Sequence, residues 1–275
     1  MDNALSDDDV LLHLQDVEFM ILKDFVKICD EYGIEYYLIY GTQIGAIRHQ
    51  GFIPWDDDID IIMFREDYEK FLKVMEENPS EKYTIFDSRY DEEYCFEFGR
   101  ISLNGTYWAE YWDKQVSFKL GIHIDLFILD NLPDNKIKRW IYIRHCYILA
   151  RLHSLSVLKF DNYSAIVNTG LNAVHRLLNL FKLTPKYFQR KSLKLFRKYE
   201  SSSGQYVTDL TLKERVVFKR DDYKPVKNAK FENYEFNIPN NDDNTLIPIY
   251  GDYMQLPPEE EQFCHILNEI DFGEY

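Results

Sequence analysis

The chain of 275 residues is long enough for one hydrophobic core with an elaboration, and its 45% hydrophobic content is that of a globular protein. A formal net charge of −15 argues against a general nucleic-acid-binding protein. The sequence shows neither a secretory signal nor about 20 uninterrupted apolar residues that would span a membrane, so we expect a cytoplasmic protein. Its four cysteines are scattered, which favours free thiols over a disulfide framework or zinc ligands.

The first 130 residues predict a mixed α/β core. Residues 10–32 repeat apolar side chains at helical spacing and indicate a long amphipathic helix, with a capping box at Ser6 and Asp9. Residues 34–40 indicate a strand, and residues 41–48 a turn that enters a short helix. A second amphipathic helix is expected at 66–77. Further strands are expected at 59–64, 83–86, 94–101 and 122–129.

A basic, helical segment follows this core. Residues 136–198 contain 14 Lys and Arg side chains and one acid, Asp161, although the whole chain is acidic. Helix breaks are expected at 161–164 and 183–185, a loop at 201–204, strands at 215–218 and 230–238, and then a proline-punctuated tail. These changes divide the chain into a catalytic core at 1–133, a basic helical segment at 134–200 and a C-terminal part at 201–275 that completes the core.

The stretch Trp55-Asp-Asp-Asp-Ile-Asp60 is the densest set of carboxylates. Side chains alternate along a strand, so Asp58 and Asp60 point the same way while the isoleucines beside them enter the core. Two adjacent carboxylates repel each other unless a cation lies between them, and Mg²⁺ is the natural occupant. An Asp-x-Asp pair alone is a weak indication, because acidic turns are common. Asp56 lies in the preceding turn and ranks below the other two.

A Gly-Thr pair, Gly41 and Thr42, lies upstream between a strand and a short helix. Glycine lets the backbone approach phosphate closely, and the amides at a helix N-terminus favour anions. Thr42 adds a hydroxyl, and Arg48 a charge-assisted contact. Most isolated Gly-Thr pairs are plain turns, but the position of this one before the paired aspartates favours a donor-phosphate site.

Asp125 interrupts the otherwise apolar strand expected at 122–129. A buried carboxylate is costly without a partner. A metal ion shared with Asp58 and Asp60 would satisfy it, and so would a neighbouring arginine. His123 shares its face, but a lone histidine is more often structural, so it stays outside the predicted site.

Together these motifs resemble the signature of the LicD family. The resemblance rests on Gly41-Thr-x-Ile-Gly-Ala-x-Arg48, Pro54-Trp-Asp-Asp-Asp-Ile-Asp60, Met63-x-Arg-x-Asp-Tyr-x-x-Phe71 and Tyr250-Gly-Asp-Tyr-Met-x-Leu-Pro-Pro258. It implies an α+β fold with a polymerase-β-like nucleotidyltransferase core, a mixed sheet flanked by helices, to which the basic helical segment is added. Carried over by position, Gly41 and Thr42 hold donor phosphate, Asp58 and Asp60 hold metal, and Asp125 is the third carboxylate.

The resemblance also implies a reaction. A phospho-alcohol, phosphocholine from CDP-choline in the favoured case, passes to a hydroxyl of a cell-surface glycan or its lipid-linked precursor, in teichoic acid, lipopolysaccharide or capsule. Such transfer depends on positioning and charge neutralisation by one or two Mg²⁺ ions, with Mn²⁺ as an alternative. Asp125, or the metal-bound acceptor, takes the proton. Arg48, with Lys219 or Arg220, neutralises the CMP leaving group, although a solvated loop is equally compatible with the last two.

A quaternary ammonium group needs aromatic faces around it. Trp108 and Trp112 offer such faces with Glu110 as a counter-charge, and Trp55 adjoins the predicted metal site. Aromatic packing is the alternative for these tryptophans. The helices of the basic segment combine apolar and cationic residues, as helices at an anionic membrane surface do, so peripheral contact with the inner leaflet through 134–200 competes with simple packing against the acidic core.

Three rival functions differ in testable ways. A metal-dependent glycosyltransferase also uses Asp-x-Asp, but there the motif follows a complete nucleotide-binding unit, whereas here it comes at residue 58. A nucleotidyltransferase proper would move NMP and release pyrophosphate, and this fold does not exclude it. A non-catalytic glycan-binding relative would have lost a carboxylate, and Asp58, Asp60 and Asp125 are all present.

Overall fold

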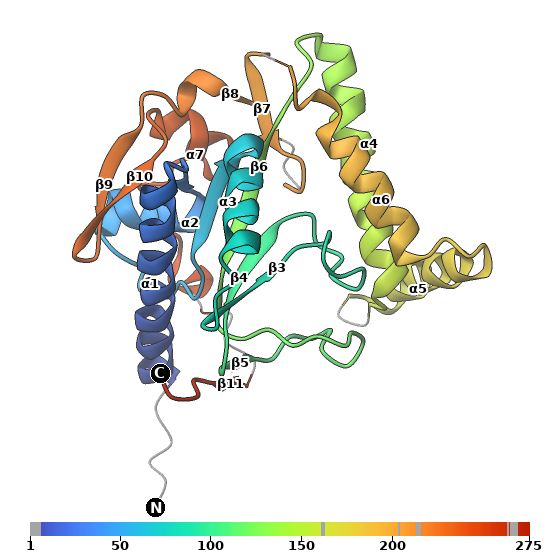
Figure 1. Cartoon of the computed structure of the whole chain (residues 1–275), viewed down its shortest axis with the longest axis horizontal. Helices are drawn as coiled ribbons and strands as arrows, with labels where there is room; N and C mark the ends of the chain where they lie inside the picture. The colour runs from blue at the N-terminus through green and yellow to red at the C-terminus, as the bar shows by residue number, and fades with distance from the viewer. Residues whose placement is uncertain (1–6, 161–162, 203, 213–215, 263, 265–268) are drawn as a thin grey trace, which may run out of the picture.

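A computed structural model describes residues 7–275 apart from 161–162, 203, 213–215, 263 and 265–268. In the described part of the chain, seven α-helices surround a curled, mixed sheet of seven strands (Figure 1). The expectation of a mixed sheet flanked by helices is confirmed. The capping box expected at Ser6 lies outside the described residues.

The sheet is built around one parallel pair of strands, β2 and β6, and its other pairings are antiparallel. Its central order is β1-β2-β6-β4-β3, and β7 joins the far end of β6 and pairs with β8. The strands are β1 (Tyr37–Leu38), β2 (Asp60–Phe64), β3 (Tyr83–Phe86), β4 (Gly99–Leu103), β6 (His123–Asn131), β7 (Tyr206–Asp209) and β8 (Phe218–Lys219).

Two amphipathic helices cover one face of this sheet, α1 (Asp7–Tyr32) and α3 (Arg65–Glu77) (Figure 1). Their apolar residues recur at helical spacing and join Ile61 of β2, and Ile59 just before it, in the largest core cluster. The antiparallel hairpin of β9 (Lys227–Phe231) and β10 (Tyr234–Ile238) closes this cluster from the side. A second short pair joins β5 (Tyr107–Trp108) to β11 (Ile270–Asp271).

Between β1 and β2 the chain forms α2 (Tyr40–Ile44), which continues into a π-helical turn, η1 (Gly45–His49). Tyr40 has a φ of 52°, which is uncommon for an aromatic residue. Its hydroxyl donates to Asp209 Oδ2 on β7 at 3.0 Å. Left-handed backbone and π-helical turns are both concentrated at functional sites, and here they flank Gly41 and Thr42.

The basic segment forms three helices, α4 (Lys136–Val157), α5 (Ala165–Leu180) and α6 (Pro185–Phe196), which lie to one side of the sheet (Figure 1). The expected breaks between them are confirmed. α4 packs against α6 and α5. In the described part of the chain, no helix is both apolar and long enough to cross a bilayer.

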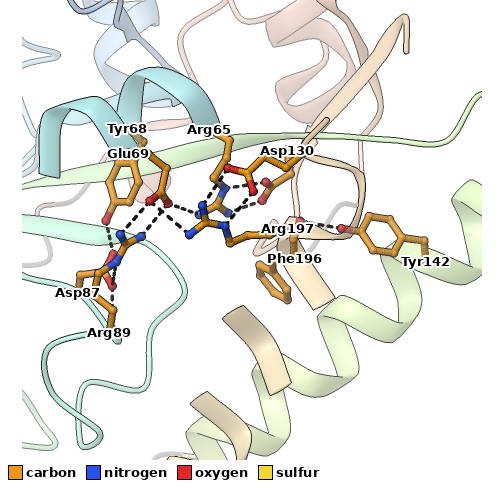
Figure 2. A network of polar contacts seen from close by, with 10 residues as sticks. Arg65, Tyr68, Glu69, Asp87, Arg89, Asp130, Tyr142, Phe196 and Arg197 are labelled. Carbon is orange, nitrogen blue, oxygen red and sulfur yellow. Dashed lines mark hydrogen bonds and ion pairs between the residues drawn. The ribbon is translucent and has the colours of Figure 1, made fainter. Parts of the chain in front are cut away.

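A polar network ties this helical segment to the core (Figure 2). Arg65 donates two hydrogen bonds to Asp130 at the end of β6, at 2.8 and 2.7 Å, and both side chains are buried. Arg197, just after α6, pairs with Glu69 of α3 at 3.3 Å. Tyr142 of α4 donates to the carbonyl oxygen of Phe196 at 2.8 Å.

Several predicted boundaries were wrong. The strand expected at 94–101 begins at Gly99, because the aromatic residues before it pack against Trp112 and Phe118 instead of pairing with a neighbouring strand. The single strand expected at 230–238 is the end of β9, a turn at Glu232, whose φ is 55°, and then β10. The tail contains a further helix, α7 (Asp242–Tyr250). No disulfide joins the four cysteines, all of which are described.

Candidate functional site

Two of the predicted carboxylates meet at the start of the parallel strand pair. Asp60 and Asp125 are partners in the register of β2 and β6, so both side chains lie on the same face of the sheet. Asp58 precedes β2 by two residues. Thr42 lies beside them, and its hydroxyl oxygen accepts from the backbone N–H of Asp60 at 2.8 Å.

Asp60 is 9% exposed, and no arginine or lysine among the described residues forms a salt bridge with it. Burial, followed by the charges of Asp58, Asp125 and Asp56, raises the pKa of Asp60 well above its usual range. Burial and the neighbouring carboxylates likewise raise the pKa of Asp56 to about 8. The ionised forms of these carboxyl groups are therefore disfavoured, so the cluster either holds protons or needs a cation beside it.

Asp125 is satisfied by an arginine, one of the two alternatives that the sequence left open. Arg100 is its partner in the register of β4 and β6, and Nε of Arg100 donates to Asp125 Oδ1 at 2.8 Å. The guanidinium also lies 3.6 Å from Glu110 and over the ring of Phe96, 5.2 Å from its centroid. Arg100 is thus a buried cation inside the candidate site.

The donor set is suited to Mg²⁺, because the converging ligands are hard carboxylate oxygens and Asp60 is buried without a counter-ion. As the side chains stand, however, no group of three or more His, Cys, Asp or Glu residues in the described chain is arranged so that it could hold a metal ion. The bond from Arg100 to Asp125 is a physical reason for this, because it draws Asp125 Oδ1 toward the guanidinium. The metal site at Asp58, Asp60 and Asp125 stays a prediction.

A cavity of about 200 Å³ opens beside this cluster. Its lining is mostly ionisable and consists of Glu18, Asp57, Asp58, Arg100, Trp108, Glu110, His123 and Asp125. Burial, followed by the charge of Arg100, lowers the pKa of His123 to about 4, so this histidine is neutral at pH 7. We call this cavity the carboxylate cavity. Asp58 and Asp125, two of the predicted catalytic residues, form part of its wall.

Sequence reasoning missed Glu18, Arg100 and His123 as lining residues. Glu18 is fully buried in α1, and a signal for it existed, since it lies one turn from Leu14 and Leu22 on the apolar face of the helix. For His123 the sequence favoured a structural role, because it is a lone histidine. Arg100 had no local signal, because its place depends on the register between β4 and β6.

A second, larger hollow of about 600 Å³ lies beside the loop of residues 56–58, whose Asp57 and Asp58 line the carboxylate cavity. Gly41, Arg48, Trp55 and Asp56 line it together with C-terminal residues from Tyr250 to Glu261. An ideal Cβ at Gly41 would lie 2.9 Å from Asp56 Oδ2, so the carboxylate occupies the space that a side chain would need. We call this hollow the tail hollow, because the LicD-like tail motif forms much of its wall.

Arg48 contributes to the tail hollow but is engaged with the backbone. Its guanidinium donates to the carbonyl oxygens of Tyr253 at 2.6 Å and Gln255 at 3.1 Å. These bonds attach the C-terminal segment to η1. Arg220 lies elsewhere, bonded to Asn131 at 2.6 Å near the far end of β6, and neither it nor Lys219 lines the two hollows.

The three tryptophans have different surroundings. Trp108 lines the carboxylate cavity, with its ring centroid 5.2 Å from that of His123. Trp55 lines the tail hollow. Trp112 is 2% exposed and packs in a core cluster with Cys95, Leu120 and Leu158, so packing, the alternative weighed for the run 107–112, describes it.

Comparisons with known proteins point in one direction. The family described as "LicD/FKTN/FKRP, nucleotidyltransferase domain" matches residues 33–167. The chain is 31% identical over 258 residues to lipopolysaccharide cholinephosphotransferase LicD of Haemophilus influenzae, covering 90% of this chain and 93% of the relative. An uncharacterised protein of Rickettsia typhi, RT0683, is 39% identical over 57 residues, 21% of this chain and 18% of that protein. RP689 of Rickettsia prowazekii is 34% identical over 67 residues, 24% of this chain and 25% of that protein.

Proposed function

The chain belongs to the LicD family, and from that premise we propose that it is a phosphotransferase that moves phosphocholine onto a hydroxyl of a lipopolysaccharide-type glycan. The observation that carries the proposal is the cluster of Asp58, Asp60 and Asp125 at the start of the parallel strand pair, beside the Gly41-Thr42 turn. The likeness to the H. influenzae cholinephosphotransferase, over nearly the whole of both chains, supports the same reaction.

We further propose a polymerase-β-like core and CDP-choline as the donor. The tail hollow has the room for a nucleotide, since pockets for ligands of this size measure roughly 300–1,000 Å³. Gly41 lies in the wall of the tail hollow against the Asp56 carboxylate, and Trp55 offers a ring for stacking. The diphosphate would then cross the loop of residues 56–58 toward the carboxylate cavity.

The transfer itself breaks a phosphoanhydride bond of the donor and forms a phosphoester bond to the acceptor. The acceptor oxygen forms a bond to the phosphorus that carries choline, the bond from this phosphorus to the bridging oxygen breaks, and CMP leaves with that oxygen. Asp58 and Asp60 would hold Mg²⁺, whose contribution when bound is neutralisation of charge on the diphosphate. Asp125 is the predicted proton acceptor, oriented by its bond to Arg100.

One assay tests the reaction class. The protein is incubated with Mg²⁺, a lipopolysaccharide acceptor and a panel of CDP-alcohols, and the products are followed by mass spectrometry. CMP release together with a phosphocholine-sized mass gain on the glycan is the expected result, and EDTA should stop it. Pyrophosphate release from CTP would identify a nucleotidyltransferase instead, and sugar transfer from a nucleotide sugar would identify a glycosyltransferase.

We also propose that the helical segment makes peripheral contact with an anionic membrane, where a lipid-linked acceptor would be presented. Large apolar side chains are exposed along α4 at helical spacing, with Lys and Arg between them. α5 also exposes apolar side chains on one side and at its C-terminal end, but its one Lys or Arg residue is Arg176. These residues are Ile137, Trp140, Ile141 and Ile148 on α4, and Ile166, Leu177, Leu180 and Phe181 at α5. Flotation with vesicles that do or do not contain anionic lipid tests this contact.

A further inference from the structure

Glu18 is a buried carboxylate that the proposed reaction does not yet use. Its relative exposure is 0%, and neither carboxylate oxygen has a hydrogen-bond partner within the described part of the chain. Burial, followed by the charges of Asp58, Asp57, Asp56 and Asp125, raises the pKa of Glu18 well above its usual range, so the ionised carboxylate needs a cation beside it. Because Glu18 lines the carboxylate cavity, a cationic ligand of that cavity would be a partner for its carboxylate.

The position of Glu18 is fixed by α1. One turn before it, the side-chain amide of Gln15 donates to the carbonyl oxygen of Asp56 at 2.8 Å, which anchors the helix beneath the loop of residues 56–58. The apolar residues of α1 on either side pack into the main core. Glu18 therefore cannot turn out to solvent without unpacking the helix, and its carboxylate stays with the cavity.

The cavity as a whole selects for a cation. Five carboxylate side chains and one guanidinium line it, and its histidine is neutral at pH 7. Arg100 bonds Asp125 and lies 3.6 Å from Glu110, and among the described residues no salt bridge joins it to Glu18. The remaining wall is the indole ring of Trp108.

We propose that Glu18 is the anionic wall of the subsite for the cationic head of the transferred alcohol, with Trp108 and Glu110 completing it. This inference rests on the proposed phosphocholine transfer. A quaternary ammonium has positive charge but no N–H group, so it pairs with a carboxylate that lacks hydrogen-bond donors and with an aromatic face. The volume of about 200 Å³ is small for a whole nucleotide, which the tail hollow accommodates, and suits a head group.

Selectivity between CDP-alcohol donors distinguishes this role of Glu18 from the roles of metal ligand and general base. A metal ligand or a general base would act on every CDP-alcohol alike, because those roles concern the phosphate or the acceptor. A counter-charge for the alcohol acts on CDP-choline and not on CDP-glycerol, whose alcohol is neutral. Glu18 is thereby a specificity-determining residue.

The test compares Glu18→Gln with wild type on CDP-choline and CDP-glycerol. Glutamine keeps the shape and removes the charge. We expect the ratio of kcat/KM for CDP-choline to that for CDP-glycerol to fall about tenfold or more, mainly through KM for CDP-choline, as for loss of one partner of a buried charge pair. Asp16→Asn is the matched control, because it removes one exposed carboxylate from the same helix and should leave the ratio unchanged.

A binding arm uses phosphocholine and glycerol 3-phosphate in calorimetry, so it does not depend on turnover. Weaker binding of phosphocholine alone in Glu18→Gln supports the assignment, and Glu18→Asp, which keeps the charge, should recover part of it. Equal losses on both donors, or unchanged binding in a folded variant, would overturn the assignment while leaving phosphocholine transfer standing. If wild type releases no CMP from CDP-choline and binds no phosphocholine, the proposed function itself fails.

Discussion

Binding of Mg²⁺ to the carboxylate cluster should raise the melting temperature of the protein. Asp60 is buried beside Asp58 and Asp125 without a salt-bridge partner among the described residues, and a divalent cation would relieve that repulsion. A ligand that binds the folded state alone at a hundred times its Kd stabilises by about 2.7 kcal/mol. At about 2–4 °C per kcal/mol for a domain of roughly this size, the melting temperature should rise by about 5–10 °C.

Differential scanning fluorimetry over a Mg²⁺ titration, with an EDTA baseline, measures this shift. Asp60→Asn should lose most of it, and in EDTA this variant should be at least as stable as wild type, because it removes a buried charge from the cluster. Asp30→Asn, an exposed change on α1, should keep the full shift. No Mg²⁺-dependent shift in wild type, or the same shift in Asp60→Asn, would show that the cluster relies on Arg100 alone and does not hold the metal.

Three further outcomes follow from other contacts. Asp130→Asn leaves the buried guanidinium of Arg65 with Glu69, at 3.5 Å, as its acidic partner, and should lower the free energy of unfolding by about 3 kcal/mol, measured in urea. Gly41→Ala places a Cβ 2.9 Å from the present position of Asp56 Oδ2, so it should lower kcat/KM for CDP-choline at least about tenfold in a folded protein. Trp140→Ser should weaken binding to anionic vesicles about tenfold without changing CMP release in solution, since this side chain is 58% exposed.

The parts of the site that the sequence predicted are those encoded locally. Strand alternation predicts Asp58 and Asp60 on one side, although β2 begins at Asp60 and Asp58 precedes the strand. The Gly41-Thr42 turn is likewise a short-range signal. Asp125 was singled out because an acid is costly in an apolar strand, which is again readable over a few residues.

The partners of these residues could not be predicted from the sequence, because they depend on the register between strands that are far apart in the chain. Arg100 reaches Asp125 only through the antiparallel pairing of β4 with β6. The same limit misplaced the start of β4, since alternating aromatic residues at 94–98 have a strand-like period but pack against Trp112 and Phe118. Periodicity shows which face a residue takes and not which neighbour it meets.

The loop of residues 56–58 is the structural element that joins the two hollows. Asp56 lines the tail hollow, and Asp57 and Asp58 line the carboxylate cavity. The loop is held from below by Gln15, which bonds the Asp56 carbonyl, and at its exit by the hydroxyl of Thr42, which accepts from the N–H of Asp60. These neutral anchors keep mutually repelling carboxylates in place without neutralising them. A donor with its nucleotide on one side and its cationic alcohol on the other would thus present its diphosphate at this loop, where a metal ion would relieve the repulsion between the ionised carboxylates.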